Sequence, residues 1–124
     1  MLNLDTHIVI WMAAGELRAE EHSRIAKEQL AISDIVLWEL AMLVRSGRVE
    51  MDLEGREFRH FMQGLTLVPI SLQIARVSAH LDFHSDPVDH IIAATSIVER
   101  IPLLTRDRKI LKSRMVPFAL QPGD

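Results

Sequence analysis

MLNLDTH, residues 1–7, is a short apolar run that ends at an aspartate, with a helical pattern opening at Thr6. The run from Leu2 to Leu4 predicts a short buried strand. The same succession, a short apolar run next to a longer periodic segment, recurs along the rest of the chain. Strands that alternate with helices favour a mainly parallel sheet with helices on its faces. The sequence therefore predicts an α/β fold.

Five short apolar runs are predicted strands, so we expect a central sheet of about five strands flanked by helices. These runs are Leu2 to Leu4, Leu30 to Ile32, Thr66 to Ile70, Pro102 to Thr105 and Val116 to Leu120.

Three helix starts carry the residues that helix N-termini prefer. Ser33 and Ser71 each precede an apolar pattern, and Asp86 is followed by Pro87 at the first helical position. Residues 52–65 also have helical spacing of their apolar side chains.

Composition limits the class of protein. The chain has 124 residues, which suits one domain over residues 1–124, and it has no cysteine, so a metal site must use oxygen or imidazole. No apolar run approaches a membrane span, and no signal sequence precedes the first strand, which favours a cytoplasmic protein without a membrane partner. The net charge of −3 argues against a protein that coats nucleic acid nonspecifically.

Basic residues nevertheless gather near the C-terminus. Arg106, Arg108 and Lys109 surround a single acid, Asp107, and are candidate contacts to a polyanionic substrate. A solvated helix face is the alternative explanation for this run.

Asp5 and Glu39 are the first two candidate site residues. Asp5 follows a strand, where ligands bind in open parallel sheets, although it also suits the role of a helix cap. Glu39 lies within the segment from Ile35 to Val44, which is apolar nearly all round and therefore predicts a buried helix. A buried carboxylate needs a cation, an arginine or a water-filled pocket. A salt bridge to Arg45 or an exposed strip is the alternative.

Asp89 and Asp107 complete the set. Asp89 falls in the first turn of the helix after Asp86, where acidic residues are favoured by the helix dipole. Asp107 follows the predicted strand ending at Thr105 and is also a candidate helix cap.

Together the four acids are expected at one edge of the sheet. Such a cluster must hold protons or a cation, because two carboxylates about 4 Å apart repel by roughly 4 kcal/mol at an effective dielectric near 20. Oxygen ligands without thiols favour Mg²⁺ or Mn²⁺, and the corresponding chemistry is hydrolysis of a phosphodiester bond.

Four motifs in this order resemble those of PIN-domain nucleases, in particular VapC-like toxins of type II toxin–antitoxin pairs. They are LDTH at 4–7, ISDIVLWEL at 32–40, HSDPVDHIIAATSI at 84–97 and IPLLTRD at 101–107. The resemblance implies a metal-dependent endoribonuclease, with Asp5, Glu39, Asp89 and Asp107 as the acidic site and with Asp5 and Asp89 as the foremost Mg²⁺ ligands.

The resemblance also implies accessory roles and partners. Thr6, Ser33 and Thr105 match polar positions that orient ligands or water, and Asp86 is either the helix cap or a ligand of a second metal. The family further implies an RNA substrate, a homodimer and a cognate VapB-like antitoxin.

Three rival interpretations remain at the level of sequence. Histidines beside the acids, namely His7, His84 and His90, suggest imidazole ligation of a metal. An aspartate nucleophile of a phosphoacceptor domain also lies at a strand end, but it leaves Glu39 unexplained. The third is a non-catalytic module that binds RNA or protein through exposed apolar residues such as Trp11 and Met12, whereas Trp38 is expected in the core.

Overall fold

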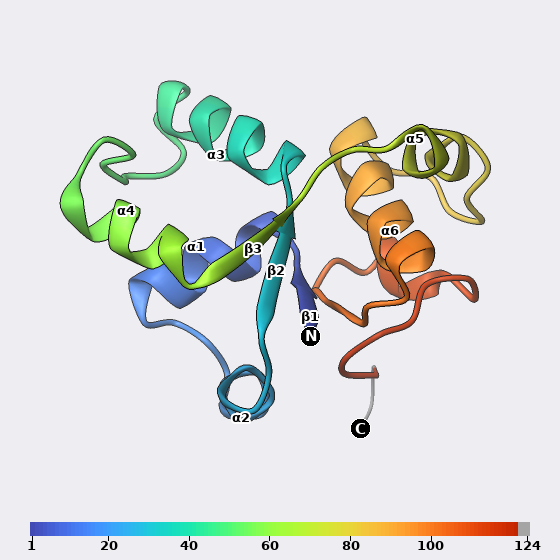
Figure 1. Ribbon diagram of the computed structural model, residues 1–124, viewed down its shortest axis with the longest axis horizontal. Coiled ribbons are helices and arrows are strands. Elements are labelled where there is room, and N and C mark those ends of the chain that lie inside the picture. Colours follow the sequence, from blue (N-terminus) through green and yellow to red (C-terminus); the bar gives the residue numbers. More distant parts are fainter. Residues whose placement is uncertain (122–124) are drawn as a thin grey trace.

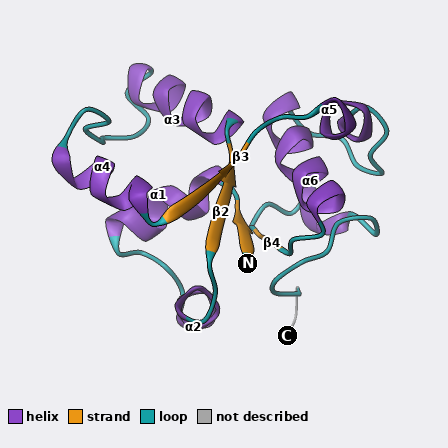
Figure 2. Ribbon diagram, viewed as in Figure 1, coloured by secondary structure: helices purple, strands orange, loops and turns teal. Residues whose placement is uncertain are grey.

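The computed structural model describes residues 1–121 and shows a parallel sheet of four strands flanked by helices (Figure 2). Its strand order is β3-β2-β1-β4, and every pairing is parallel. The α/β prediction is confirmed, with four strands instead of about five. The strands are β1 (Leu2–Leu4), β2 (Leu30–Ser33), β3 (Leu65–Val68) and β4 (Leu103–Leu104).

Helices cover both faces of the sheet (Figure 1), with α1 and α4 on one side and α5 and α6 on the other. The helices α1, α3, α5 and α6 start at or within one residue of the positions predicted from the sequence. The bounds of the helices are α1 (Thr6–Ala14), α2 (Ala19–Ala26), α3 (Ile35–Arg45), α4 (Arg56–Gln63), α5 (Leu72–Ser78) and α6 (Pro87–Glu99), followed by a single 3₁₀ turn, η1 (Ile110–Lys112).

The prediction of a fifth strand over Val116 to Leu120 is wrong. Phe118 forms one isolated parallel bridge with Leu103, and the neighbouring backbone is otherwise irregular. Pro117 has no N–H to donate, and the N–H of Val116 donates to the Ser113 hydroxyl instead of to a strand. The ladder therefore stops after one residue pair.

Two helix predictions also need correction. The helix expected over residues 52–65 is shorter, because Gly55 is its N-cap and Gly64 its C-cap. Helix α2 was not predicted, since its sequence AEEHSRIA has few apolar residues. The expected N-cap Ser33 ends β2, and Asp34 precedes α3 instead, although the Ser33 hydroxyl still accepts a hydrogen bond from the Ile35 N–H at 3.3 Å.

The core lies between the sheet and the helices on both of its faces. β1 is fully buried at the centre of the sheet, and α6 packs against it with Ile92 and Ala93 inside. Trp38 was expected in the core, and that prediction is wrong, because the side chain is 54% exposed on α3. None of the helices in the described part of the chain has the length and apolar character needed to cross a lipid bilayer.

Candidate active site

A pocket of about 300 Å³ opens where the strands β1 and β4 end. All four acids predicted as catalytic line it, although they come from the end of β1, from α3, from the start of α6 and from the loop after β4. Because the strands are parallel, their carboxyl ends meet at one edge and bring these segments together. We call this cavity the acidic pocket, and its lining is Asp5, His7, Trp11, Glu39, Asp86, Asp89, Arg106 and Asp107.

Asp5 is buried directly after β1 and caps helix α1. Its Oδ1 accepts a hydrogen bond from the Thr6 N–H at 2.8 Å, and its Oδ2 accepts one from the Thr105 hydroxyl at 2.6 Å. Burial raises the pKa of Asp5 above its ordinary value, and these two hydrogen bonds oppose the rise without cancelling it. Asp5 is therefore both the helix cap and a wall of the pocket.

Asp89 is held in the first turn of α6, where its N–H donates to Asp86 Oδ1 at 3.1 Å. Its Oδ2 accepts a hydrogen bond from the Ser85 hydroxyl. Burial, together with the charges of Asp5, Asp86 and Asp107, raises the pKa of Asp89 to about 7 in spite of the Ser85 hydrogen bond. Near neutral pH, the carboxyl group of Asp89 is therefore partly protonated. A raised pKa is expected where carboxylates lie close together without a cation.

Asp107 caps the turn that leads into η1. Its Oδ1 accepts hydrogen bonds from the Lys109 N–H at 2.8 Å and the Ile110 N–H at 3.2 Å. Its own N–H donates to the Thr105 hydroxyl at 3.0 Å, and that hydroxyl also donates to Asp5. Thr105 therefore links the carboxylate of Asp5 to the backbone N–H of Asp107.

Glu39 reaches the acidic pocket from α3, but its helix is not buried all round. Only Val36 and Leu40 of α3 are buried, and Glu39 itself is half-buried. The prediction of a helix buried nearly all round is therefore wrong, whereas Glu39 does border a pocket, which was one of its expected surroundings. Within residues 1–121, Glu39 forms no ion pair with Arg45, which is exposed.

The remaining accessory residues differ in their burial and in whether they line the acidic pocket. Thr6 is fully buried beside Asp5, and its hydroxyl has no hydrogen-bond partner within residues 1–121. Ser33 is also buried, but it lies outside the pocket lining. Asp86 is the N-cap of α6, which confirms the first of its two predicted roles, and it also lines the acidic pocket, so a role as a ligand of a second metal stays a prediction.

Of the three basic residues predicted to contact substrate, Arg106 is already engaged by protein groups. Its guanidinium donates from Nε and from Nη2 to the two carboxylate oxygens of Glu21, both at 2.7 Å, and it lies 3.8 Å from the ring centroid of Trp11. Arg108 and Lys109 are exposed. The solvent-facing positive charge of this run therefore begins after Asp107.

The histidines take separate positions. His7 lines the acidic pocket, and His84 is exposed. The Nε2 atom of His90 accepts a hydrogen bond from the Ser85 N–H at 3.1 Å, so this imidazole holds the loop before α6 and is turned away from ligation through that atom.

Sequence reasoning missed Ser85 and Glu21, which shape the site, and it named Trp11 only as a candidate contact of a non-catalytic module. Ser85 and Asp89 are four residues apart, whereas a capping box has a spacing of three, so their spacing carries no clear signal for this contact. His7 and Trp11 have the i, i+4 spacing that places two side chains on one face of α1. Glu21 gives no such signal, because its partner Arg106 is 85 residues away.

The donor set of the acidic pocket fits Mg²⁺ or Mn²⁺ bound largely through water. Within residues 1–121, no three Asp, Glu or His side chains stand close enough together to enclose a metal ion by themselves. Mg²⁺ typically takes one or two protein carboxylates and keeps several waters. The raised pKa values of Asp5 and Asp89, caused first by burial, show carboxylates whose charge a cation would stabilise.

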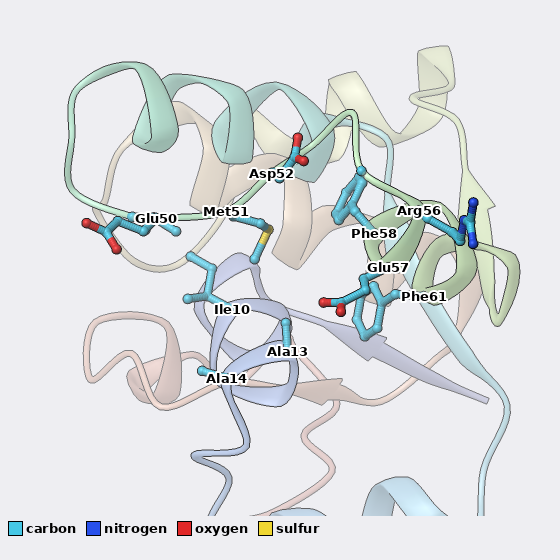
Figure 3. A pocket seen from close by; sticks show the side chains of 12 residues that line it. Ile10, Ala13, Ala14, Glu50, Met51, Asp52, Arg56, Glu57, Phe58 and Phe61 are labelled. Atoms are coloured by element: carbon cyan, nitrogen blue, oxygen red, sulfur yellow. The ribbon is translucent and has the colours of Figure 1, made fainter.

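A second pocket, of about 670 Å³, lies between α1, α4 and the segment before α4 (Figure 3). Ile10, Ala13 and Ala14 of α1 face Met51 and the rings of Phe58 and Phe61 across it, while acidic side chains stand at its edge. We call it the apolar groove. Its lining is Ile10, Ala13, Ala14, Val49, Glu50, Met51, Asp52, Gly55, Arg56, Glu57, Phe58 and Phe61.

Comparison with known proteins extends over nearly the whole chain. A curated protein from Mycobacterium tuberculosis, Ribonuclease VapC22, is 28% identical over 117 residues, which cover 90% of each chain. A toxin–antitoxin complex from Klebsiella pneumoniae contains a chain with a TM-score of 0.70 and 22% identity, covering 98% of this chain and 99% of that one.

A third relative has the same fold at lower sequence identity. A chain in the DNA-bound VapBC structure from Salmonella typhimurium has a TM-score of 0.74 and 17% identity, covering 94% of this chain and 95% of that one. The family model described as the PIN domain matches residues 3–114, which include β2, β3, β4, all of β1 except Leu2, and the whole acidic pocket. The resemblance noted in the sequence is confirmed, and the chain belongs to the PIN-domain family.

Proposed function

We propose that this chain is a Mg²⁺-dependent endoribonuclease that hydrolyses RNA phosphodiester bonds, acting as the toxin of a type II toxin–antitoxin pair. The observation that carries the proposal is the gathering of five carboxylates around one cavity at the carboxyl edge of the sheet. The similarity to a ribonuclease from Mycobacterium tuberculosis supports the choice of RNA as substrate.

In this proposal, Asp5 and Asp89 are the direct ligands of Mg²⁺, which Mn²⁺ can replace. When bound, the cation supplies positive charge beside the scissile phosphate and makes a water molecule more acidic. Glu39 and Asp107 orient that water and accept its proton, since both reach the same cavity from other elements. Thr105 fixes the carboxylate of Asp5 through its 2.6 Å hydrogen bond.

Arg108 and Lys109 are the proposed phosphate contacts. Both are exposed and follow Asp107 directly, so their side chains start at the rim of the acidic pocket. Positive charge there offsets the repulsion between the carboxylates and the RNA backbone.

The apolar groove is the proposed docking site of the antitoxin. It has apolar walls from α1 and α4, and its edge carries Glu50, Asp52 and Glu57. An antitoxin segment with apolar side chains and flanking basic residues complements such a surface. The structures from Klebsiella pneumoniae and Salmonella typhimurium are of a toxin–antitoxin complex and of VapBC, respectively, which supports a partner of this kind.

We further propose that two copies associate through the exposed apolar side chains near the end of β3. Trp38, Ile70 and Leu72 are 54%, 40% and 69% exposed. They lie in neighbouring segments, because the backbone N–H of Asp34, just before α3, donates to the Val68 carbonyl at 3.0 Å. Sedimentation analysis tests the homodimer, and substitution of Trp38 by Glu is expected to shift the protein to a monomer.

The nuclease proposal is tested by incubating the purified protein with a circular single-stranded RNA in Mg²⁺ and in EDTA. A circular substrate has no ends, so its cleavage shows endonuclease activity. We expect cleavage only in Mg²⁺, and a loss of at least about 100-fold in Asp5→Asn, because an essential charge is removed from the site.

Asp52→Asn is the matched control, since Asp52 is an exposed carboxylate of the apolar groove and lies outside the acidic pocket. Equal cleavage in EDTA would overturn the metal dependence. RNA that is bound but left intact by the wild-type protein in Mg²⁺ would instead identify a non-catalytic binding module.

A further inference from the structure

Four side chains from three separate segments form a row beside the acidic pocket. The carboxylate of Glu21 in α2 pairs with the guanidinium of Arg106, which lies over the indole ring of Trp11. The imidazole of His7 follows, with its ring centroid 5.7 Å from that of Trp11 and the planes inclined by 46°.

Within this row, Arg106 acts as a support for Trp11. Both oxygens of the buried Glu21 carboxylate accept hydrogen bonds from it, and the Glu16 carbonyl accepts another at 3.3 Å. A guanidinium fixed in this way covers one face of the indole and holds the ring by a cation–π contact, so a base would stack on the opposite face. The orientation of Trp11 is therefore set before any ligand arrives.

Helix α1 connects this row of side chains to the proposed site. Asp5 is the N-cap of this helix, and His7 and Trp11 are one turn apart on the same face. Both rings belong to the lining of the acidic pocket, together with Asp5 and Asp107. An aromatic surface thus lies directly beside the carboxylates that would bind the metal and phosphate.

The chemistry of this wall differs from that of the rest of the cavity. The other lining residues are carboxylates, which do not stack on a nucleobase, and Arg106, whose guanidinium is already engaged by Glu21 and Trp11. Aromatic side chains stack on bases regardless of their identity, and only unpaired nucleotides have a face free for this contact.

We propose that His7 and Trp11 form a stacking wall for a base of single-stranded RNA next to the bond that is cut. This inference rests on the proposed nuclease function, and it names the unpaired nucleotide as the feature that the site selects. Trp11 is the main contact, and His7 extends its surface toward solvent.

Fluorescence provides a test that does not depend on catalysis. The chain has two tryptophans and no tyrosine, so Trp38→Phe leaves Trp11 as the sole reporter, and Trp11→Phe leaves Trp38. Both variants also carry Asp5→Asn to prevent cleavage. Each is titrated in Mg²⁺ with a short single-stranded RNA and with an abasic oligomer of the same backbone and charge.

We expect the RNA, and not the abasic oligomer, to quench Trp11, while Trp38 stays unchanged because it lies outside the acidic pocket. Equal effects of the two oligomers, or equal quenching of both tryptophans, would overturn the stacking wall.

Steady-state cleavage by proteins with an intact Asp5 provides the second measurement. Loss of one stacked base typically weakens binding by roughly 5- to 150-fold, so we expect KM to rise within that range in Trp11→Ala and to be largely restored in Trp11→Phe. A merely structural role for Trp11 would lower the melting temperature and kcat and leave KM unchanged.

The outcomes separate the two proposals. Cleavage of RNA by the wild-type protein, with no base-dependent quenching of Trp11, overturns the stacking wall and leaves the nuclease proposal standing. Base-dependent quenching of Trp11 without any cleavage by the wild-type protein supports the wall and overturns the nuclease proposal. Absence of both overturns both.

Discussion

At the scale of single residues, opposing interactions act on the carboxyl group of Asp89. Burial and three neighbouring carboxylates raise its pKa to about 7, while the Ser85 hydroxyl donates a hydrogen bond that favours the charged form. The folded protein therefore binds a proton at Asp89 more tightly than the unfolded chain does. Ionisation of this carboxyl destabilises the metal-free fold, and a cation in the pocket would reverse that effect.

We predict that wild-type protein without metal becomes less stable as pH rises from about 4 to about 7, because Asp89 loses its proton in the folded state at the higher value. Asp89→Asn should reduce this slope, of which the buried Asp5 retains a part, and should stabilise the metal-free protein above pH 7. The gain should be well below about 4 kcal/mol, because one pKa unit corresponds to about 1.4 kcal/mol and solvent screening discounts the full shift. Urea unfolding in EDTA across this pH range measures the difference.

Asp82→Asn is the control, because it should change the free energy of unfolding in the opposite direction. The Ser113 hydroxyl and the Arg114 N–H donate to Asp82, and these hydrogen bonds hold the pKa of that carboxyl below its ordinary value. Its stabilising contribution is present above the ordinary pKa and is lost in acid, so the substitution should destabilise the protein at neutral pH. Parallel pH profiles for wild type and Asp89→Asn would contradict the assignment.

Residue-level sequence analysis could place the acids and could not choose between their roles. Asp5, Asp86 and Asp107 each cap a helix or turn, which confirms the cap interpretation, and the same side chains line the acidic pocket, so their catalytic roles stay predictions. Glu39 was the residue argued most strongly from an apolar helix, and that helix proved partly exposed. Side-chain exposure depends on packing between distant segments, which no local pattern encodes.

At the scale of elements, helix α2 is attached mainly by polar contacts. Glu21 pairs with Arg106, and Arg24 donates to the Ala119 carbonyl and to Glu28. The apolar residues that sequence analysis uses to detect helices are few here, which is why α2 was not predicted. Elements with regular apolar spacing, such as α6 with Asp86 and Pro87 at its start, were predicted closely.

We predict that Glu21→Gln destabilises the protein at neutral pH by about 1–3 kcal/mol, because it leaves the partly buried Arg106 without its counter-charge. Burial opposes ionisation of Glu21, but the hydrogen bonds from Arg106 and from the Arg18 N–H outweigh it and hold its pKa below the ordinary value. The stabilisation is therefore present above the ordinary pKa and fades as pH falls through the lowered one.

Thermal unfolding at neutral and acid pH checks this result. Glu20→Gln is the control on the same helix, with an exposed side chain and an expected change of less than about 0.5 kcal/mol. If Glu21→Gln and Glu20→Gln unfold alike at neutral pH, α2 is not held by the Glu21–Arg106 pair.

At the scale of the whole molecule, helix α1 connects the two pockets. His7 and Trp11 line the acidic pocket, whereas Ile10, Ala13 and Ala14 line the apolar groove. The proposed RNA site and the proposed antitoxin site therefore share one helix and are separated by its width. A partner in the groove contacts the element whose N-cap is Asp5.

We predict that Ala13→Arg weakens binding of the antitoxin at least about tenfold, because a long charged side chain obstructs the apolar groove. The partner for this test is the product of the neighbouring gene, co-expressed and purified with the chain. Affinity is measured by titration of the separated components.

Ala26→Arg is the matched control, since Ala26 is also an exposed helical alanine but lines neither pocket. RNA cleavage by the isolated Ala13→Arg protein should stay at the wild-type level, because Ala13 is outside the acidic pocket. Undiminished binding by Ala13→Arg would show that the antitoxin docks on another surface.

The hydrogen bond from Thr105 to Asp5 joins residues 100 positions apart, and β1 pairs with β4 over the same separation. During synthesis, Asp5 leaves the ribosome long before Thr105 and Asp107, so the cavity is incomplete until the chain has been made beyond Asp107. Contacts of such long range also form late and slowly in folding. The proposed active site is therefore absent from the growing chain while its first hundred residues are being translated.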